Sequence, residues 1–195
     1  TIEMVKVPTP YSKARKAVFL DRDGVINRNL NKYVLSIESV QLIPRSLQAI
    51  ANLAKSEYAL VIVTNQSAIG RGLITEEIAQ NINNFILEKI QSANGIIDGI
   101  YLCPHHPKIH CVCRKPNPGM LIQAAAELNL DLENSWLIGD AITDIQASIA
   151  ANVKPIMVGT GRGTEQAANL NSDKLAHVPF VKDLYEAIED ILSNA

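Results

Sequence analysis

A continuous apolar run, Ala59-Leu60-Val61-Ile62-Val63-Thr64, most constrains how this chain can fold. Its successive apolar positions and β-branched side chains are typical of a strand that is buried on both faces. Such a strand lies in a parallel sheet with helices packed above and below it. The shorter run Ala17-Val18-Phe19-Leu20 has the same character. The sequence therefore predicts a sheet that helices cover on both sides.

Strands and helices are expected to alternate along the chain. Strands are predicted at residues 17–20, 59–64, 99–103, 136–139 and 154–158, with a short one near 176–178. Helices are predicted at 44–55, 76–93, 118–128, 143–151 and 181–192, a loop at 65–72 and a glycine-rich turn at 159–163. This alternation predicts an α/β fold with a doubly wound parallel sheet. We expect one domain over residues 1–195, with residues 1–16 as an N-terminal arm.

Two helix starts carry recognisable caps. Thr75 is the expected N-cap of the helix at 76–93, and Asn117 with Pro118 the expected cap and first residue of the helix at 118–128. The apolar side chains expected to face inward from the first of these helices are Ile78, Ile82, Phe85, Ile86 and Ile90.

Composition narrows the function classes. The 195 residues carry a net charge of −2, which argues against a nucleic-acid partner because such proteins normally have a basic surplus. No apolar run is long enough for a membrane span, and the first residues do not resemble a signal peptide. The three cysteines fall within residues 103–113, too close together for a disulfide framework, so we expect a reducing, cytoplasmic location. We also expect a monomer that binds a small phosphorylated substrate and no membrane.

Acidic and polar side chains follow the predicted strands at their carboxyl ends, where ligands bind in such sheets. Asp21 and Asp23 lean to one side of the first strand's end, because side chains alternate along an extended chain. The pair alone is also compatible with a solvated turn. The polar residues expected at the later strand ends and loops are Thr64, Asn65, Lys115 and Asp140, with Asp144 four residues further on. Their convergence predicts an active site.

This set fits phosphoryl transfer through an aspartyl-phosphate. Asp21 is the predicted nucleophile, and Asp23 the predicted acid and then base. Thr64 and Lys115 would hold the phosphoryl oxygens. The candidate Mg²⁺ ligands are Asp21, Asp23 and Asp140. Asp144 is either a further ligand or a first-turn helix acid.

A cysteine and histidine cluster predicts a second metal. Cys103, Cys111 and Cys113 offer three thiolates, and His105, His106 or His110 could supply the imidazole of a tetrahedral Cys₃His site for Zn²⁺. Such a closed site is structural and would make the loop before Lys115 rigid.

These motifs resemble those of the haloacid dehalogenase superfamily. The similar segments are Asp21-Arg22-Asp23-Gly24-Val25-Ile26-Asn27, Val63-Thr64-Asn65-Gln66-Ser67, Lys115 and Gly139-Asp140-x-x-x-Asp144. Two further segments are similar to the branch that contains histidinol phosphatases and heptose bisphosphate phosphatases: Cys103-Pro104-His105-His106-Pro107 and Cys111-x-Cys113-Arg114-Lys115-Pro116-x-Pro118-Gly119-Met120. The resemblance implies a Rossmann-like core with a minimal cap, and it selects His105 as the zinc ligand.

The resemblance also implies a substrate. A heptose 1,7-bisphosphate is the preferred expectation and histidinol phosphate the alternative. A nucleic-acid-end phosphatase and a catalytically silent zinc-stabilised binding module are rivals from other classes. Asn65, Arg71 and Arg114 are the candidate substrate-binding residues, although Arg71 could be a solvated loop charge and Arg114 a structural residue beside the zinc.

Overall fold

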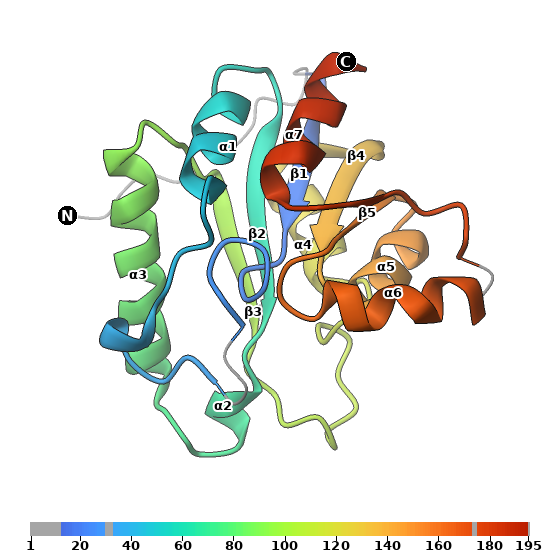
Figure 1. Ribbon diagram of the computed structural model, residues 1–195. Coiled ribbons are helices and arrows are strands. Elements are labelled where there is room, and N and C mark those ends of the chain that lie inside the picture. The colour runs from blue at the N-terminus through green and yellow to red at the C-terminus, as the bar shows by residue number, and fades with distance from the viewer. Residues whose placement is uncertain (1–12, 30–32, 173–174, 195) are drawn as a thin grey trace.

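The strands form one parallel sheet. In the computed structural model, which describes residues 13–29, 33–172 and 175–194, six strands pair in the order β3-β2-β1-β4-β5-β6, each pair parallel (Figure 1). Their bounds are β1 Arg15–Leu20, β2 Ala59–Asn65, β3 Gly99–Cys103, β4 Leu130–Gly139, β5 Lys154–Val158 and β6 Phe180–Val181. The chain winds outward from β1 through β2 and β3, then from β4 through β5 and β6. The switch between the two directions lies between β1 and β4. The predicted doubly wound fold is confirmed.

Helices cover both faces of the sheet because β1 alternates its apolar side chains between two cores. Val18 and Leu20 pack in the core under α1 (Ser46–Leu53), α3 (Glu76–Ser92) and α7 (Leu184–Ser193). Ala17 and Phe19 pack in the core under α4 (Gly119–Leu128) and α5 (Ile142–Ala150). Three further helices complete the described chain: η1 Ile37–Ser39, α2 Ser67–Gly70 and α6 Gly163–Ser172. Within the described chain, no helix combines the length and the apolar character that a membrane span requires.

The structure corrects several element predictions in the loops. The loop predicted at 65–72 contains the one-turn helix α2, which lies against the backbone of Pro104 through a hydrogen bond from Gly70 N to Pro104 O of 2.8 Å. The turn predicted at 159–163 leads directly into α6, which sequence reasoning missed. That helix packs Leu170 against the α5 core, a long-range contact that its weak apolar pattern did not reveal.

Other corrections concern element ends. The strand expected near 176–178 lies at β6, and α7 begins after Asp183, whose side chain accepts a hydrogen bond from Glu186 N at 3.0 Å. β4 begins six residues before the predicted start at 136, since its early part pairs with Arg15 and Lys16. Those two residues therefore belong to β1 and not to an N-terminal arm, whose first 12 residues lie outside the described part of the chain. Pro118, and not Asn117, is the N-cap of α4.

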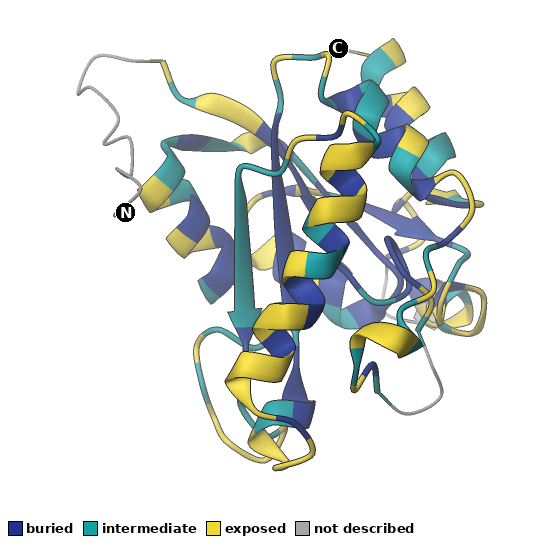
Figure 2. Cartoon of the chain, turned by 90° about the vertical axis from the view of Figure 1, so that its left-hand side faces the viewer, coloured by how far each residue is buried: buried dark blue, intermediate teal, exposed yellow. Residues whose placement is uncertain are grey.

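Helix α3 bears out its predicted cap and most of its predicted inner face. Thr75 Oγ1 accepts a hydrogen bond from Ile78 N at 3.2 Å, and Ile82, Ile86 and Ile90 are buried. The prediction was wrong for Ile78, which is 39% exposed. Figure 2 shows that α3 has one buried face and one exposed face. Phe85 is half-buried. The buried face also contains a polar residue, Asn83.

Ile82 and Ile78 give a matched test of this packing. Replacing Ile82 with alanine removes a fully buried side chain, so the free energy of unfolding should fall by about 2–5 kcal/mol. Ile78→Ala should change it by no more than about 0.5 kcal/mol. Urea unfolding of both variants measures the difference, and equal losses would contradict this placement of α3.

Candidate active site

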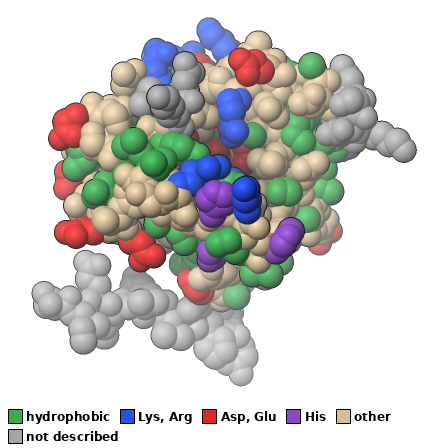
Figure 3. All heavy atoms as spheres, turned by 90° about the horizontal axis from the view of Figure 1, so that it is seen from below, with side chains coloured by type: hydrophobic (Ala, Val, Ile, Leu, Met, Phe, Trp, Pro, Cys, Tyr) green, Lys and Arg blue, Asp and Glu red, His purple; other side chains and the backbone are tan. Residues whose placement is uncertain are grey.

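The predicted site residues converge at the carboxyl ends of the strands. From that side, Lys, Arg and His side chains gather around a hollow near the middle of the molecule (Figure 3). The cleft has a volume of about 650 Å³. Its lining includes every candidate catalytic and substrate-binding residue: Asp21, Asp23, Thr64, Asn65, Arg71, Arg114 and Lys115. Asp140 lies beneath the cleft, fully buried.

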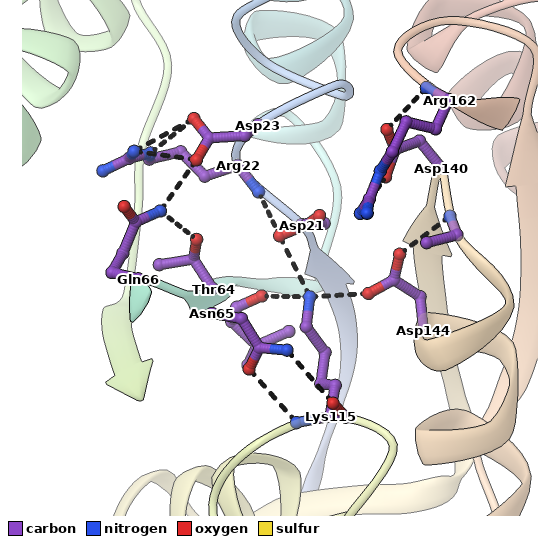
Figure 4. A network of polar contacts seen from close by, with 12 residues as sticks. Asp21, Arg22, Asp23, Thr64, Asn65, Gln66, Lys115, Asp140, Asp144 and Arg162 are labelled. Atoms are coloured by element: carbon purple, nitrogen blue, oxygen red, sulfur yellow. Dashed lines mark hydrogen bonds and ion pairs between the residues drawn. The ribbon is translucent and has the colours of Figure 1, made fainter. Parts of the chain in front are cut away.

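Lys115 joins three of the strand ends (Figure 4). Its Nζ lies 2.9 Å from Asp21 Oδ1 and 2.6 Å from Asp144 Oδ1, and it donates a hydrogen bond of 2.9 Å to Val63 O. Burial lowers the pKa of Lys115, but the neighbouring carboxylates Asp144 and Asp21 outweigh burial and raise it above its ordinary value. The lysine is therefore a fixed cation at the floor of the cleft.

Three carboxylates crowd this floor. One oxygen each of Asp21, Asp140 and Asp144 lie within 4.8 Å of one another. Burial raises the pKa of Asp21 from 3.8 to about 6; Lys115 opposes this shift, whereas the negative charges of Asp144 and Asp23 add to it. Lys115 alone does not offset three buried acids, so the cluster favours further positive charge.

Asp140, which directly follows β4, also contacts the segment between β5 and α6. Its Oδ2 accepts a hydrogen bond of 2.8 Å from Arg162 N, and the guanidinium of Arg162 lies 3.6 Å from Oδ1. Gly24 and Gly161, both with positive φ, pack against this carboxylate so closely that a Cβ at either position would collide with it. Burial, with repulsion from Asp21, raises the pKa of Asp140.

The contacts of Asp144 bear on its two predicted roles, a further Mg²⁺ ligand or a first-turn helix acid. Its Oδ2 accepts a hydrogen bond of 3.0 Å from Ala141 N at the start of α5, as expected for a first-turn acid. Its Oδ1 faces Lys115. Both oxygens therefore have protein partners, and Asp144 serves as the counter-ion of Lys115.

Asp23 turns away from the other three acids and is absent from their cluster. Its Oδ1 and Oδ2 receive hydrogen bonds from Arg22, Asn27 Nδ2 (2.8 Å) and Gln66 Nε2 (2.8 Å). Burial raises the pKa of Asp23, but the charge of Arg22 and these hydrogen bonds outweigh it and set the pKa below its ordinary value. These partners therefore favour the charged form of the Asp23 carboxylate.

Two residues, Asn65 at the end of β2 and Gln66 directly after it, position other residues of the site. Gln66 Nε2 donates to Thr64 Oγ1 at 2.8 Å as well as to Asp23, so it fixes the threonine beside the acid. Asn65 forms two hydrogen bonds with the backbone of Lys115, each 3.1 Å long. The predicted substrate ligand Asn65 therefore has both ends of its amide engaged in holding Lys115.

The two candidate substrate arginines differ in their surroundings. Arg114 is half-buried, and its buried NH1 atom has no hydrogen-bond partner among the described residues. Arg71 is exposed, with its guanidinium carbon 6.0 Å from the centre of the Tyr33 ring. A buried guanidinium nitrogen without a partner is costly. The surroundings of Arg114 therefore favour the binding of an anion more than those of Arg71.

The predicted metal-binding loop brings its cysteines and one histidine together. The Sγ atoms of Cys103, Cys111 and Cys113 lie 3.1–3.7 Å apart, and His105 Nδ1 lies 3.2 Å from Cys113 Sγ and 3.5 Å from Cys103 Sγ. His105, and not His106 or His110, belongs to this cluster. Burial raises the pKa of the Cys103 thiol to about 12.

This cluster is tied to the catalytic floor. Asn117 Nδ2 donates a hydrogen bond of 2.7 Å to Cys111 O, and Gly119 N donates one of 3.1 Å to Val112 O. The loop thereby doubles back and delivers Lys115 into the cleft. These hydrogen bonds connect the cysteine cluster to the segment that carries Lys115.

Sequence reasoning missed four residues of the site: Arg22, Asn27, Gln66 and Arg162. The first three lie within the motifs Asp21–Asn27 and Val63–Ser67, so their position beside the selected residues was an available signal. Arg162 lies in a segment where only a turn was expected. Its approach to Asp140 depends on how β5 and β4 pair, which no local pattern reports.

The raised pKa of Asp21 predicts a pH-dependent stability of the metal-free protein. Because the folded state holds this proton more tightly than the unfolded state, the stabilisation is complete below about pH 4 and is lost as pH rises through about 6, by up to about 3 kcal/mol. Urea unfolding with a chelator present measures it. Asp21→Asn should flatten this part of the profile, and an unchanged profile would contradict the assignment.

Comparison with known proteins gives the family. A family model described as HAD-hydrolase-like matches residues 112–187. The D-glycero-beta-D-manno-heptose-1,7-bisphosphate 7-phosphatase of Photorhabdus laumondii is 43% identical over 175 residues, which cover 84% of this chain and 93% of that protein. The protein of the same name from Escherichia coli K12 is 39% identical over 180 residues, with 86% and 94% covered.

A solved structure agrees. The D,D-heptose 1,7-bisphosphate phosphatase from Bordetella bronchiseptica, crystallised with magnesium and phosphate, superposes with a TM-score of 0.87 at 35% identity, over 92% of this chain and 99% of that one. The predicted resemblance is confirmed, and the chain belongs to the haloacid dehalogenase-like hydrolases, in the branch of the heptose bisphosphate phosphatases.

Proposed function

We propose that this protein is a Mg²⁺-dependent phosphatase that hydrolyses the 7-phosphate ester of D-glycero-D-manno-heptose 1,7-bisphosphate. The observation that carries the chemistry is Asp21, a buried carboxylate on a strand end, with Lys115 at 2.9 Å and two further acids beside it. The names of the similar proteins support the substrate. Histidinol phosphate remains the alternative within the same chemistry.

The residues support two successive displacements at phosphorus. Asp21 attacks the phosphorus while the bond to the ester oxygen breaks, and Asp23 gives its proton to the departing oxygen. Water then attacks the aspartyl-phosphate, Asp23 takes a proton from it, and the Asp21 carboxylate leaves. The negative charge of a bound phosphoryl group raises the pKa of Asp23 by repulsion, which favours the protonated form that the first step needs. Thr64 and Lys115 stabilise the phosphoryl oxygens.

The acidic floor fits Mg²⁺. Asp21 and Asp140 would hold the ion, since the buried Oδ1 of Asp140 accepts no hydrogen bond from the described residues. Asp23 was also a candidate ligand, but its carboxylate is directed to Arg22 and Gln66. When bound, Mg²⁺ neutralises the charge on the nucleophile and on the phosphate oxygens.

The cysteine cluster fits Zn²⁺. A tetrahedral site with Zn–S bonds of about 2.3 Å and a Zn–N bond of about 2.0 Å requires S–S separations of about 3.8 Å and S–N separations of about 3.5 Å. The separations of 3.1–3.7 Å lie near these values. Zinc would remove the mutual repulsion of three neighbouring thiolates. Its ligands would be Cys103, His105, Cys111 and Cys113.

Arg114 is the proposed anchor for the distal phosphate of the substrate. It precedes Lys115 directly, lines the same cleft and has an unpaired buried nitrogen, so a second phosphate in the cleft would complete its hydrogen bonds. Arg71, which also lines the cleft but is exposed, would contribute a weaker, solvent-screened contact. Such a small substrate fits a monomer without a nucleic-acid partner, and the free thiols fit the reducing cytoplasm.

The nucleophile can be tested directly. Asp21→Asn should lower kcat by about a thousand-fold or more, because an amide does not attack phosphorus. Asp190→Asn, on the exposed side of α7, is the control and should retain full activity. Phosphate release by the Asp21→Asn variant at the control's rate would overturn the assignment.

The proposed zinc ligands can be tested with two histidine variants, His105→Ala and His106→Ala. His105→Ala should lose the metal, whereas the wild type and His106→Ala should hold about one zinc per chain, measured by elemental analysis. Retention of zinc by His105→Ala, together with loss by His106→Ala, would show that the cluster uses the other histidine.

Substrate choice separates the two arginines. Arg114→Ala should lower kcat/KM for the heptose bisphosphate by about 10- to 100-fold, the range expected for a lost hydrogen bond to a charged group. The same change should matter less for histidinol phosphate, which lacks a second phosphate. Steady-state kinetics on both substrates, with Arg71→Ala in parallel, decides between the arginines. A greater loss in Arg71→Ala would assign the distal phosphate to that residue, and wild-type preference for histidinol phosphate would overturn the proposed substrate.

A further inference from the structure

Arg22 has no role in the two displacements, yet it is among the largest fully buried side chains of the protein, with 1% exposure. It stands between the nucleophile and Asp23 in the sequence, and its side chain leaves the cleft on the side opposite Asp21 (Figure 4). Burying a guanidinium is costly unless its donors are satisfied. The hydrogen-bond partners of Arg22 indicate why the guanidinium is buried here.

The guanidinium links helix α3 to Asp23. NH1 donates a hydrogen bond of 2.8 Å to Oδ1 of Asn83, the polar residue on the buried face of α3. On its other side, NH2 contacts both oxygens of Asp23 at 3.0 and 2.9 Å, and Nε donates to Oδ1 at 3.1 Å. The planar fork of arginine makes such a contact directional. Asn83 thus fixes the plane of Arg22, and Arg22 fixes the plane of the Asp23 carboxylate.

Stability alone does not require this arrangement. Replacing a buried ion pair by apolar residues of similar size is often neutral or stabilising. The neighbours of Asn83 on this face of α3, such as Ile82 and Ile86, are apolar, and an apolar residue would fit the pattern there. What an apolar residue would not provide is an acceptor for Arg22.

We propose that Asn83 and Arg22 are positioning residues that hold the Asp23 carboxyl group toward the oxygen of the departing alcohol. This inference rests on the proposed role of Asp23 as general acid. It predicts that loss of Asn83 harms the reaction in proportion to how much the leaving group needs a proton. An alkoxide such as that of a sugar needs one, whereas p-nitrophenolate does not.

The test compares two neighbouring asparagines on two classes of substrate. Asn83→Ala should lower kcat/KM for the sugar phosphate by about 10-fold or more and for p-nitrophenyl phosphate by less than about 2-fold. Asn83→Asp, which keeps an acceptor oxygen, should recover most of the sugar phosphate activity. Asn84→Ala, at the exposed next position of α3, is the control and should change neither rate.

The outcomes separate the possibilities. Equal losses on both substrates, or no loss on either, would overturn the positioning role. If p-nitrophenyl phosphate is turned over too slowly to compare, the crystal structure of Asn83→Ala decides, since an unmoved Arg22–Asp23 pair contradicts the proposal and a rotated Asp23 supports it. A wild-type protein without phosphatase activity would instead refute the proposed function itself.

Discussion

The ammonium of Lys115 is the charge on which the rest of the site depends. Without it, Asp21 and Asp144 would be two buried carboxylates that repel each other across the gap between β1 and β4. With it, the Asp21 carboxylate is held at a defined position while its pKa still lies above the ordinary value. That balance leaves the acidic floor short of positive charge. It accounts for both the fit to Mg²⁺ and the approach of Arg162 to Asp140.

Lys115 is not delivered by a strand, so the protein must position it by other means. The loop with the Cys₃His cluster doubles back onto α4, and Asn65 at the end of β2 holds the backbone of the lysine on both sides. Helix α2 in turn lies on the same loop through Gly70. The proposed zinc therefore bears on the chemistry as well as on the fold. It would make rigid the loop that carries Lys115, a proposed catalytic residue that lies on a loop and not at the end of a strand.

Local patterns were enough to predict the parallel sheet and to select the polar residues that lie together in the cleft. The buried strand at 59–64, the acid pair after β1 and the cysteine spacing each carry their signal within a few residues. What those patterns missed depends on distant segments meeting. Asn65, a predicted substrate-binding residue, lines the cleft, and it also holds the backbone of Lys115, 50 residues away, which no local pattern reports. Asn83 is a polar interruption of an apolar face, and only the position of Arg22 explains it. Helix α6 has too weak an apolar pattern to be recognised before Leu170 reaches its core.

Covalent phosphorylation of Asp21 is the step on which the proposed chemistry depends. Rapid acid quenching of the protein during turnover, followed by peptide mapping with mass spectrometry, tests it most directly. We expect one phosphoryl group on the peptide that contains Asp21, present only while substrate remains and absent in Asp21→Asn. A phosphoryl group on a different residue, or turnover with no phosphorylated peptide when the chemical steps are slowed, would contradict it.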